Sequence, residues 1–184
     1  MHSKRKKSEP FAYARTEALI DETDRTILRA LVAEPRISSA KLARAARLSR
    51  PAVVQRVRRL EAARVILGWR VDLNPAALGL PISVYIRIRP IARQLGTVAD
   101  LAKALDAVVE CHRITGDDCF LVKAHVASIA DLERLLDRFQ PFGQTTTSVA
   151  QSSPVEPRNP PIPATAVGKA IQGRERSARI GSAN

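Results

Sequence analysis

The sequence lacks the features of a membrane-spanning, secreted or disulfide-rich protein. In 184 residues, no apolar run approaches the roughly 20 that a membrane span requires. The charged N-terminus has no apolar stretch behind it, so we expect no secretory signal. The two cysteines, Cys111 and Cys119, stand at unequal offsets from a predicted turn between them. We therefore expect two reduced thiols in a cytoplasmic, nucleoid-associated protein.

Groups of residues that carry catalysis or bind metal ions are missing too. His112 and His125 have no neighbours at metal-ligand spacing. Ser49 stands before a helical pattern, where it caps the helix and has no base to activate it. The sequence also has no glycine-rich phosphate loop. We expect no enzyme activity, no metal site and no cofactor.

Negative charge is scarce, and its distribution is informative. The formal net charge is +12. Residues 19–72 hold twelve Lys or Arg against six acids, whereas residues 81–150 hold eight of each. The ends, residues 1–18 and 151–184, each carry +3. Charge kept only for solubility would not leave the middle of the chain neutral, so the first segment is predicted to bind a polyanion.

Changes in composition divide the chain into five segments. Residues 1–17 form a basic arm and residues 152–184 a Pro-rich tail, and we expect both to be flexible. Residues 18–64 and 81–151 are the two predicted folded domains. Residues 65–80 join them through a predicted strand over 65–73, an Asn74-Pro75 turn signal and a Gly79-Leu80-Pro81 break.

The first domain is predicted to contain three short helices. Asp21, Ser38 and Ser49 can each accept a hydrogen bond from the backbone at a helix start. A short turn, Arg47-Leu48, precedes the third helix. Pro51 in the first turn of that helix costs little, because its missing N–H has no partner there anyway. A tight turn between two such helices is typical of a helix-turn-helix.

The third helix points to double-stranded DNA as the polyanion. Val53, Val57 and Leu60 are spaced i, i+4 and i+7, so they form one buried stripe. Arginine can make bidentate bonds to guanine and glutamine to adenine in the major groove, and other arginines suit phosphates. The opposite face carries Gln55 among arginines. The predicted DNA-binding residues are Ser38, Ser49, Arg50, Pro51, Gln55, Arg56, Arg58 and Arg59.

The second domain alternates strand and helix patterns. Ile82, Val84, Ile86 and Ile88 recur with period 2 and predict a half-buried strand. A helix over 98–105, strands over 108–114 and 120–126, a helix over 129–139 and a strand over 145–151 follow. The predicted fold class is α+β, with an N-terminal (winged) helix-turn-helix joined to a C-terminal βαββαβ ferredoxin-like domain. Both helices should cover one sheet face, and the open face argues for self-association.

Several runs, in this order and spacing, resemble the leucine-responsive/asparagine regulators (Lrp/AsnC) of bacteria and archaea. The resemblance covers about residues 19–162. It rests on the runs Leu19-Ile20-Asp21-Glu22-Thr23-Asp24-Arg25-Thr26-Ile27-Leu28, Ile37-Ser38-Ser39-Ala40-Lys41-Leu42-Ala43, Leu48-Ser49-Arg50-Pro51-Ala52-Val53, Arg56-Val57-Arg58-Arg59-Leu60-Glu61, Val65-Ile66-Leu67-Gly68-Trp69, Val109-Glu110-Cys111-His112-Arg113-Ile114-Thr115-Gly116-Asp117-Asp118-Cys119 and Thr145-Thr146-Thr147-Ser148-Val149.

The resemblance implies a regulator whose N-terminal domain binds DNA and whose C-terminal domain assembles dimers into higher oligomers, often octamers. It also implies an amino acid or related small metabolite as effector, bound between subunits beside Gly116 and Asp118, with Thr147 as a further candidate. The same Gly-Asp-Asp run is also a common hairpin turn. Family members usually have glycine where Arg47 stands, and an aromatic residue where Asp117 stands.

Two further classes remain open from the residues. A DNA-compacting architectural protein with little sequence preference and no effector would also suit basic tails and multivalent assembly. An enzyme is conceivable because ferredoxin-like domains host catalysis elsewhere, although no constellation of residues supports one here.

Overall fold

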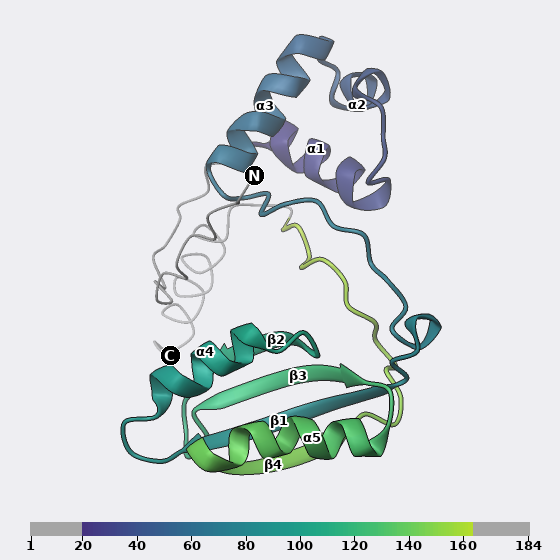
Figure 1. The fold of residues 1–184 in the computed structure, drawn as a ribbon. Helices are drawn as coiled ribbons and strands as arrows, with labels where there is room; N and C mark the ends of the chain where they lie inside the picture. Colours follow the sequence, from purple (N-terminus) through teal and green to yellow (C-terminus); the bar gives the residue numbers. More distant parts are fainter. Residues whose placement is uncertain (1–19, 164–184) are drawn as a thin grey trace, which may run out of the picture. The chain divides into compact units, whose positions relative to one another are not determined.

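The structure, a computed structural model, describes residues 20–163. The basic arm predicted for residues 1–17 and the end of the predicted Pro-rich tail lie outside these residues. The described chain divides into two compact units: residues 20–69 group with residues 158–163 as the first, and Arg70–Pro157 is the second (Figure 1). No helix among the described residues is long and apolar enough to cross a membrane.

The first unit is built from three helices, as the sequence predicts. They are α1 (Glu22–Ala33), α2 (Ser39–Ala46) and α3 (Arg50–Ala62). Asp21, Ser38 and Ser49 cap them through their side chains, and Asp21 forms a reciprocal capping box with Asp24. The buried core comprises Ile27, Leu42, Ala43, Val53 and Leu60. The described part of this unit contains no strand.

The predicted linker strand over 65–73 does not form in the single chain. Leu67, Trp69, Val71 and Leu73 alternate with polar or small residues, as in a strand, but all four are more than half exposed. A strand requires a neighbour to bond its backbone N–H and C=O groups, and the described chain places none beside this segment. The Trp69 ring is fixed instead by an Nε1–H bond of 2.9 Å to the Glu61 side chain.

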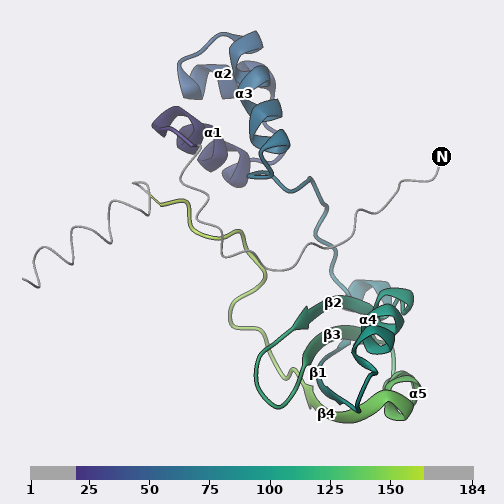
Figure 2. The same ribbon diagram turned by 90° about the vertical axis from the view of Figure 1, so that its left-hand side faces the viewer.

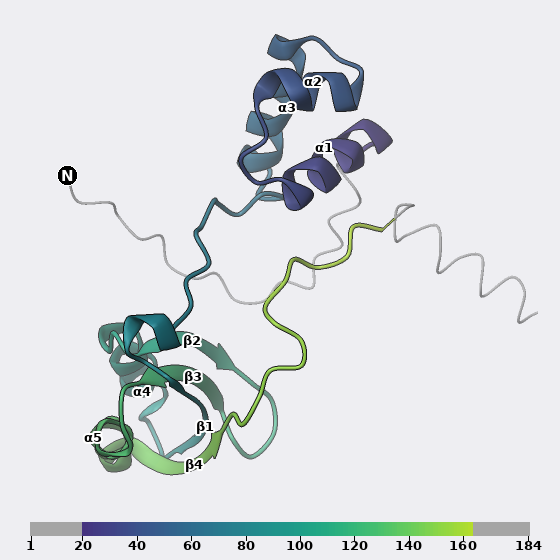
Figure 3. The ribbon, with the colours of Figure 1, turned by 90° about the vertical axis from the view of Figure 1, so that its right-hand side faces the viewer.

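The second unit is a four-stranded antiparallel sheet. It contains β1 (Ile82–Pro90), α4 (Leu95–Ala104), β2 (Val108–Arg113), β3 (Phe120–Val126), α5 (Ile129–Phe139) and β4 (Gly143–Val149), with 3₁₀ turns Ala76–Leu78 and Gln140–Phe142. The strand order β2-β3-β1-β4 confirms the βαββαβ prediction. Both helices lie on one face of the sheet (Figures 2 and 3).

The core of the second unit lies between the sheet and these two helices. Even-numbered residues of β1 and β3 face the helices, with Val84 opposite Ala124 and Ile86 opposite Val122. Phe120 and Phe139 are the largest fully buried side chains. The other face carries the odd-numbered residues of both strands and has no covering element in the described chain. The Gly116 turn and the ends of the strands therefore remain accessible.

Candidate functional site

The exposed face of α3 is cationic and carries one amide. Arg50, Pro51, Gln55 and Arg58 are all exposed, as the helical spacing predicts. Ser49 is occupied as a cap, since its Oγ accepts the Ala52 N–H at 3.4 Å. Hydrogen-bonding and charged groups that project from one helix face can read base edges or contact phosphates.

The turn before α3 adds another cation. Arg47 adopts the left-handed conformation, with φ 53° and ψ 43°, in the place where glycine would fit without strain. Its backbone N–H bonds the carbonyls of Ala43 and Arg44, which ends α2. Ser38 is exposed at the start of α2, where its Oγ accepts the Lys41 N–H at 3.3 Å. The turn thus brings α2 and α3 together with arginines on its outside.

Two of the predicted DNA-binding residues, Arg56 and Arg59, pair with acidic residues at the start of α1 instead. Arg56 Nη1 donates to Asp21 Oδ2 at 2.6 Å and to Asp24 Oδ1 at 2.9 Å. Arg59 Nη2 pairs with Asp24 Oδ2. The Arg56 guanidinium holds the pKa of Asp21 below its ordinary value through that hydrogen bond, against a smaller opposing effect of burial. Arg56 and Arg59 therefore fasten α3 to the start of α1 in the free protein.

The predicted effector residues lie around the turn between β2 and β3. Gly116 has φ 106°, a conformation that side chains rarely adopt, and is exposed. Asp118 lies 3.8 Å from Arg87 Nε and 3.9 Å from Arg89 Nε, and Asp117 lies 3.3 Å from Arg89 Nη2. The arginine pair on β1 was missed from sequence, although its alternation with Ile86 and Ile88 places it on the open face.

Thr147, the third predicted effector residue, does not join this cluster. It stands opposite Ile86 in the β1–β4 register, and directly opposite residues point to the same face. Thr147 therefore faces the helix layer, whereas Arg87 and the Asp118 carboxylate lie on the open face. Within one chain these residues do not form a single site.

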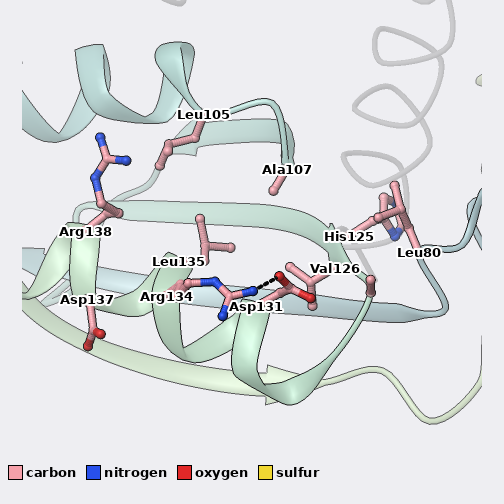
Figure 4. A pocket seen from close by; sticks show the side chains of 11 residues that line it. Leu80, Leu105, Ala107, His125, Val126, Asp131, Arg134, Leu135, Asp137 and Arg138 are labelled. Atoms are coloured by element: carbon pink, nitrogen blue, oxygen red, sulfur yellow. Dashed lines mark hydrogen bonds and ion pairs between the residues drawn. The ribbon is translucent and has the colours of Figure 1, made fainter.

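A cavity of about 580 Å³ lies in the second unit, at the other end of β3 from the Gly116 turn. Its floor is apolar and its rim is charged, with two arginines, Arg134 and Arg138, one helical turn apart on α5. Figure 4 shows Leu135 within it and Arg134 bonded to Asp131. The lining residues are Leu80, Leu105, Ala107, His125, Val126, Ala127, Asp131, Arg134, Leu135, Asp137 and Arg138.

The remaining titratable side chains do not assemble into a metal centre. No group of three or more His, Cys, Asp or Glu in the described residues could hold a metal ion. Cys111 lies opposite Val122 in the β2–β3 register, and both cysteines are free thiols, as the sequence predicts. Partial desolvation by the surrounding protein raises the pKa of the Cys111 thiol, although the residue is exposed.

Two family models match the chain in the order of its two units. The AsnC-type helix-turn-helix domain matches residues 20–61, and the Lrp/AsnC ligand binding domain matches residues 83–160. The first model lies within the first unit, and the second lies within the second unit except for its last three residues.

Individual relatives extend this likeness over most of the chain. The HTH-type transcriptional regulator LrpA of Mycobacterium tuberculosis is 33% identical over 137 residues, which cover 74% of this chain and 89% of that protein. The structure of Escherichia coli AsnC is 29% identical, with a TM-score of 0.71, and covers 77% of this chain and 99% of that one. The feast or famine regulatory protein from M. tuberculosis, complexed with L-methionine, is 30% identical with a TM-score of 0.71 and covers 76% and 97%.

Proposed function

The chain belongs to the Lrp/AsnC family of DNA-binding transcription regulators, and on that premise we propose how it binds DNA, assembles and responds to a small molecule. Its recognition helix is α3, and its site of action is chromosomal DNA in the cytoplasm. The observation that carries this proposal is the exposed row of Arg50, Gln55 and Arg58 behind a capped, tight turn.

The roles of these side chains differ. Arg47, Arg50 and Arg58 are exposed cations that suit phosphates and supply affinity for any duplex. Gln55 is the one amide on the exposed face, so it supplies discrimination by bonding adenine in the major groove. Ser38, Ser49 and Pro51 stand at the starts of α2 and α3, beside the DNA backbone. There the two serine hydroxyl groups can donate to phosphate oxygens.

Homodimerisation would give the extended linker around Val71 the neighbouring strand that it lacks in the single chain. An antiparallel pair centred on Val71 would place Arg70 opposite Asp72 of the second copy, twice over, with Trp69 opposite Leu73. Arg70 and Asp72 already approach at 3.0 Å within one chain, so they share one side of the extended segment. The apolar residues share the other side, and pairing would give the backbone groups their partners.

The open sheet face supports higher assembly, up to an octamer. It has no covering element in the described chain, and the sequence of residues 81–150 is electrically neutral, so copies do not repel one another. Two-fold pairing would set two recognition helices about one DNA turn, or a multiple, apart, and the binding site would then be roughly palindromic.

Charge exchange in the linker tests the dimer. Arg70→Glu would place an acidic side chain opposite Asp72 of the second copy, twice in the dimer. It should therefore weaken dimerisation of the full chain, measured by light scattering or sedimentation at several concentrations. The double variant Arg70→Glu with Asp72→Arg restores both pairs and should recover it. If the single and double variants dimerise equally, the linker pairing is wrong.

The effector proposed from the sequence is an amino acid held at the Gly116–Asp118 turn between subunits. Backbone N–H groups of the turn and the Arg89 guanidinium can take its carboxylate. Asp118, whose carboxylate faces Arg87 and Arg89, can take its ammonium group by a charge-assisted hydrogen bond. The relative complexed with L-methionine supports the class of ligand.

Calorimetry with the twenty amino acids tests this site. Asp118→Ala should abolish binding while oligomeric state and basal DNA affinity stay unchanged. Arg138→Ala, on the rim of the α5 cavity, is the matched control and should bind as the unmodified protein does. Loss of binding in Arg138→Ala alone would move the effector to the cavity, and no heat with any amino acid would refute an amino-acid effector.

An architectural role remains the second candidate, because the basic segments of this chain would also suit even coating of DNA. Genome-wide mapping of bound sites, repeated with the amino acids, separates the two. A regulator protects defined sites and shifts between them with its effector, whereas an architectural protein covers DNA without site preference.

A further inference from the structure

We infer that the buried carboxylate of Asp24 keeps Arg56 and Arg59 of the recognition helix from contacting DNA phosphates and so limits the affinity of the protein for DNA of any sequence. The inference rests on the proposed DNA surface of α3. It assigns to Asp24, on a different helix, the role of a positioning residue that sets the strength of sequence-independent binding.

Both oxygens of Asp24 are fully engaged. Its side chain is 0% exposed, and it is the one acidic residue that the described chain buries completely. Oδ1 accepts Arg56 Nη1 at 2.9 Å, and Oδ2 accepts both the Asp21 backbone N–H at 3.0 Å and Arg59 Nη2. Arg56 and Arg59 are spaced i, i+3 on α3, so one carboxylate can hold both.

A buried charge makes this arrangement persistent. A carboxylate out of water is unfavourable unless it is paired, and removing its partners leaves that cost uncompensated. Arg59 is 53% exposed and Arg56 30% exposed, so both stems could otherwise reach toward solvent. If either guanidinium turned toward a phosphate, the buried Asp24 carboxylate would lose a partner. The phosphate contact would not offset that loss, because it is made at the surface, in water. The arginines therefore stay with Asp24 when DNA is bound.

Fewer available cations mean fewer phosphate contacts. Non-specific binding consists almost entirely of such contacts, and each one adds about 0.9 to the slope of log affinity against log salt. Two arginines held by Asp24 thus lower affinity for every sequence alike. The base contact of Gln55 is untouched, so the ratio of specific to non-specific affinity stays the same.

The Asp24→Asn variant isolates the charge from the cap. An asparagine side chain keeps a carbonyl oxygen that can accept the Asp21 N–H, so α1 can still start at the same residue. The neutral amide no longer holds two guanidinium groups electrostatically. The matched control is Glu22→Gln, which removes one negative charge two residues away, where Glu22 pairs with Arg25 and Arg29 and not with α3.

The test is a salt titration of DNA affinity on a matched site and on an unrelated duplex. Asp24→Asn should steepen the slope by about 0.9 to 1.8 and raise affinity for the matched site and the unrelated duplex by similar factors. Glu22→Gln should leave the slope within a few tenths of the unmodified protein. An unchanged slope and an unchanged affinity for both duplexes in folded Asp24→Asn would overturn the inference.

A second pair of variants keeps the inference testable if Asp24→Asn fails to fold. Arg58→Gln should flatten the slope by about 0.9, because Arg58 is free to neutralise a phosphate. Arg59→Gln should not flatten it, because Arg59 is already neutralised by Asp24. Equal flattening by both would overturn the inference, whereas flattening by neither, without a site-specific complex, would instead refute the proposed DNA surface.

Discussion

In the turn between α2 and α3, backbone geometry alone decides whether one substitution raises or lowers stability. Arg47 is held at φ 53° and ψ 43°. This left-handed conformation costs a side-chain-bearing residue about 1–2 kcal/mol, because Cβ crowds the following carbonyl oxygen. Glycine avoids that cost but loses about 0.5–1 kcal/mol more backbone entropy on folding. We expect Arg47→Gly to stabilise the first unit by about 0.5–1 kcal/mol.

Arg44→Gly is the control, because Arg44 lies three residues earlier, within α2 itself. It removes the same exposed side chain and the same charge, but from a helical position in the last turn of α2. Glycine there costs about 1 kcal/mol relative to a good helix former, so this variant should lose stability. The backbone hydrogen bonds that Arg47 makes to Ala43 and Arg44 survive in both variants.

Thermal unfolding followed by circular dichroism is the assay. Each kcal/mol moves the midpoint of a small domain by about 4–8 °C, so the two variants should differ visibly and in opposite directions from the unmodified protein. If both variants shift the midpoint the same way, charge removal decides the outcome, and the argument from the left-handed turn is refuted.

Two further predictions concern the second unit. Gly143→Ala should destabilise the second unit by about 1–3 kcal/mol, because a Cβ there would lie 2.5 Å from the Arg89 carbonyl oxygen. Gly96→Ala, in α4, should stabilise it by up to about 1 kcal/mol, because a Cβ there would meet nothing within 4 Å. Chemical denaturation of both variants checks the opposite signs. Burial lowers the pKa of His125, so the unfolded chain protonates first as pH falls below about 6.5, and stability should decline from there toward the lower folded pKa. His125→Gln should remove that decline in urea titrations between pH 7 and 5, and a decline of unchanged size would show that another group causes it.

Local patterns in the sequence predict much of the fold because the physics behind them is local. Caps such as Asp21 and Ser49 bond residues three positions away, so a short window suffices to recognise them. The strand Phe120–Val126 was predicted to the residue, since period-2 burial and the following turn are both visible in the sequence.

Features that depend on contacts between distant segments could not be read in this way. Helical spacing places Arg59 on the exposed face of α3, but only the packing of α1 shows that Asp24 holds it. Thr147 and Asp118 looked like one site because register, and hence the face to which Thr147 points, is not visible in the sequence. The linker around Val71 has strand periodicity without a strand, because periodicity does not supply a neighbour.

The central claim is that α3 reads DNA with Gln55 and holds it with Arg58. Affinity titrations at several salt concentrations, on matched duplexes and on duplexes changed at single base pairs, test it most directly. Gln55→Ala should cost about 1–3 kcal/mol at one base position and leave the salt slope unchanged. Arg58→Ala should weaken binding to all sequences and flatten the slope by about 0.9. Equal affinity of the unmodified protein and both variants for every duplex would contradict the account.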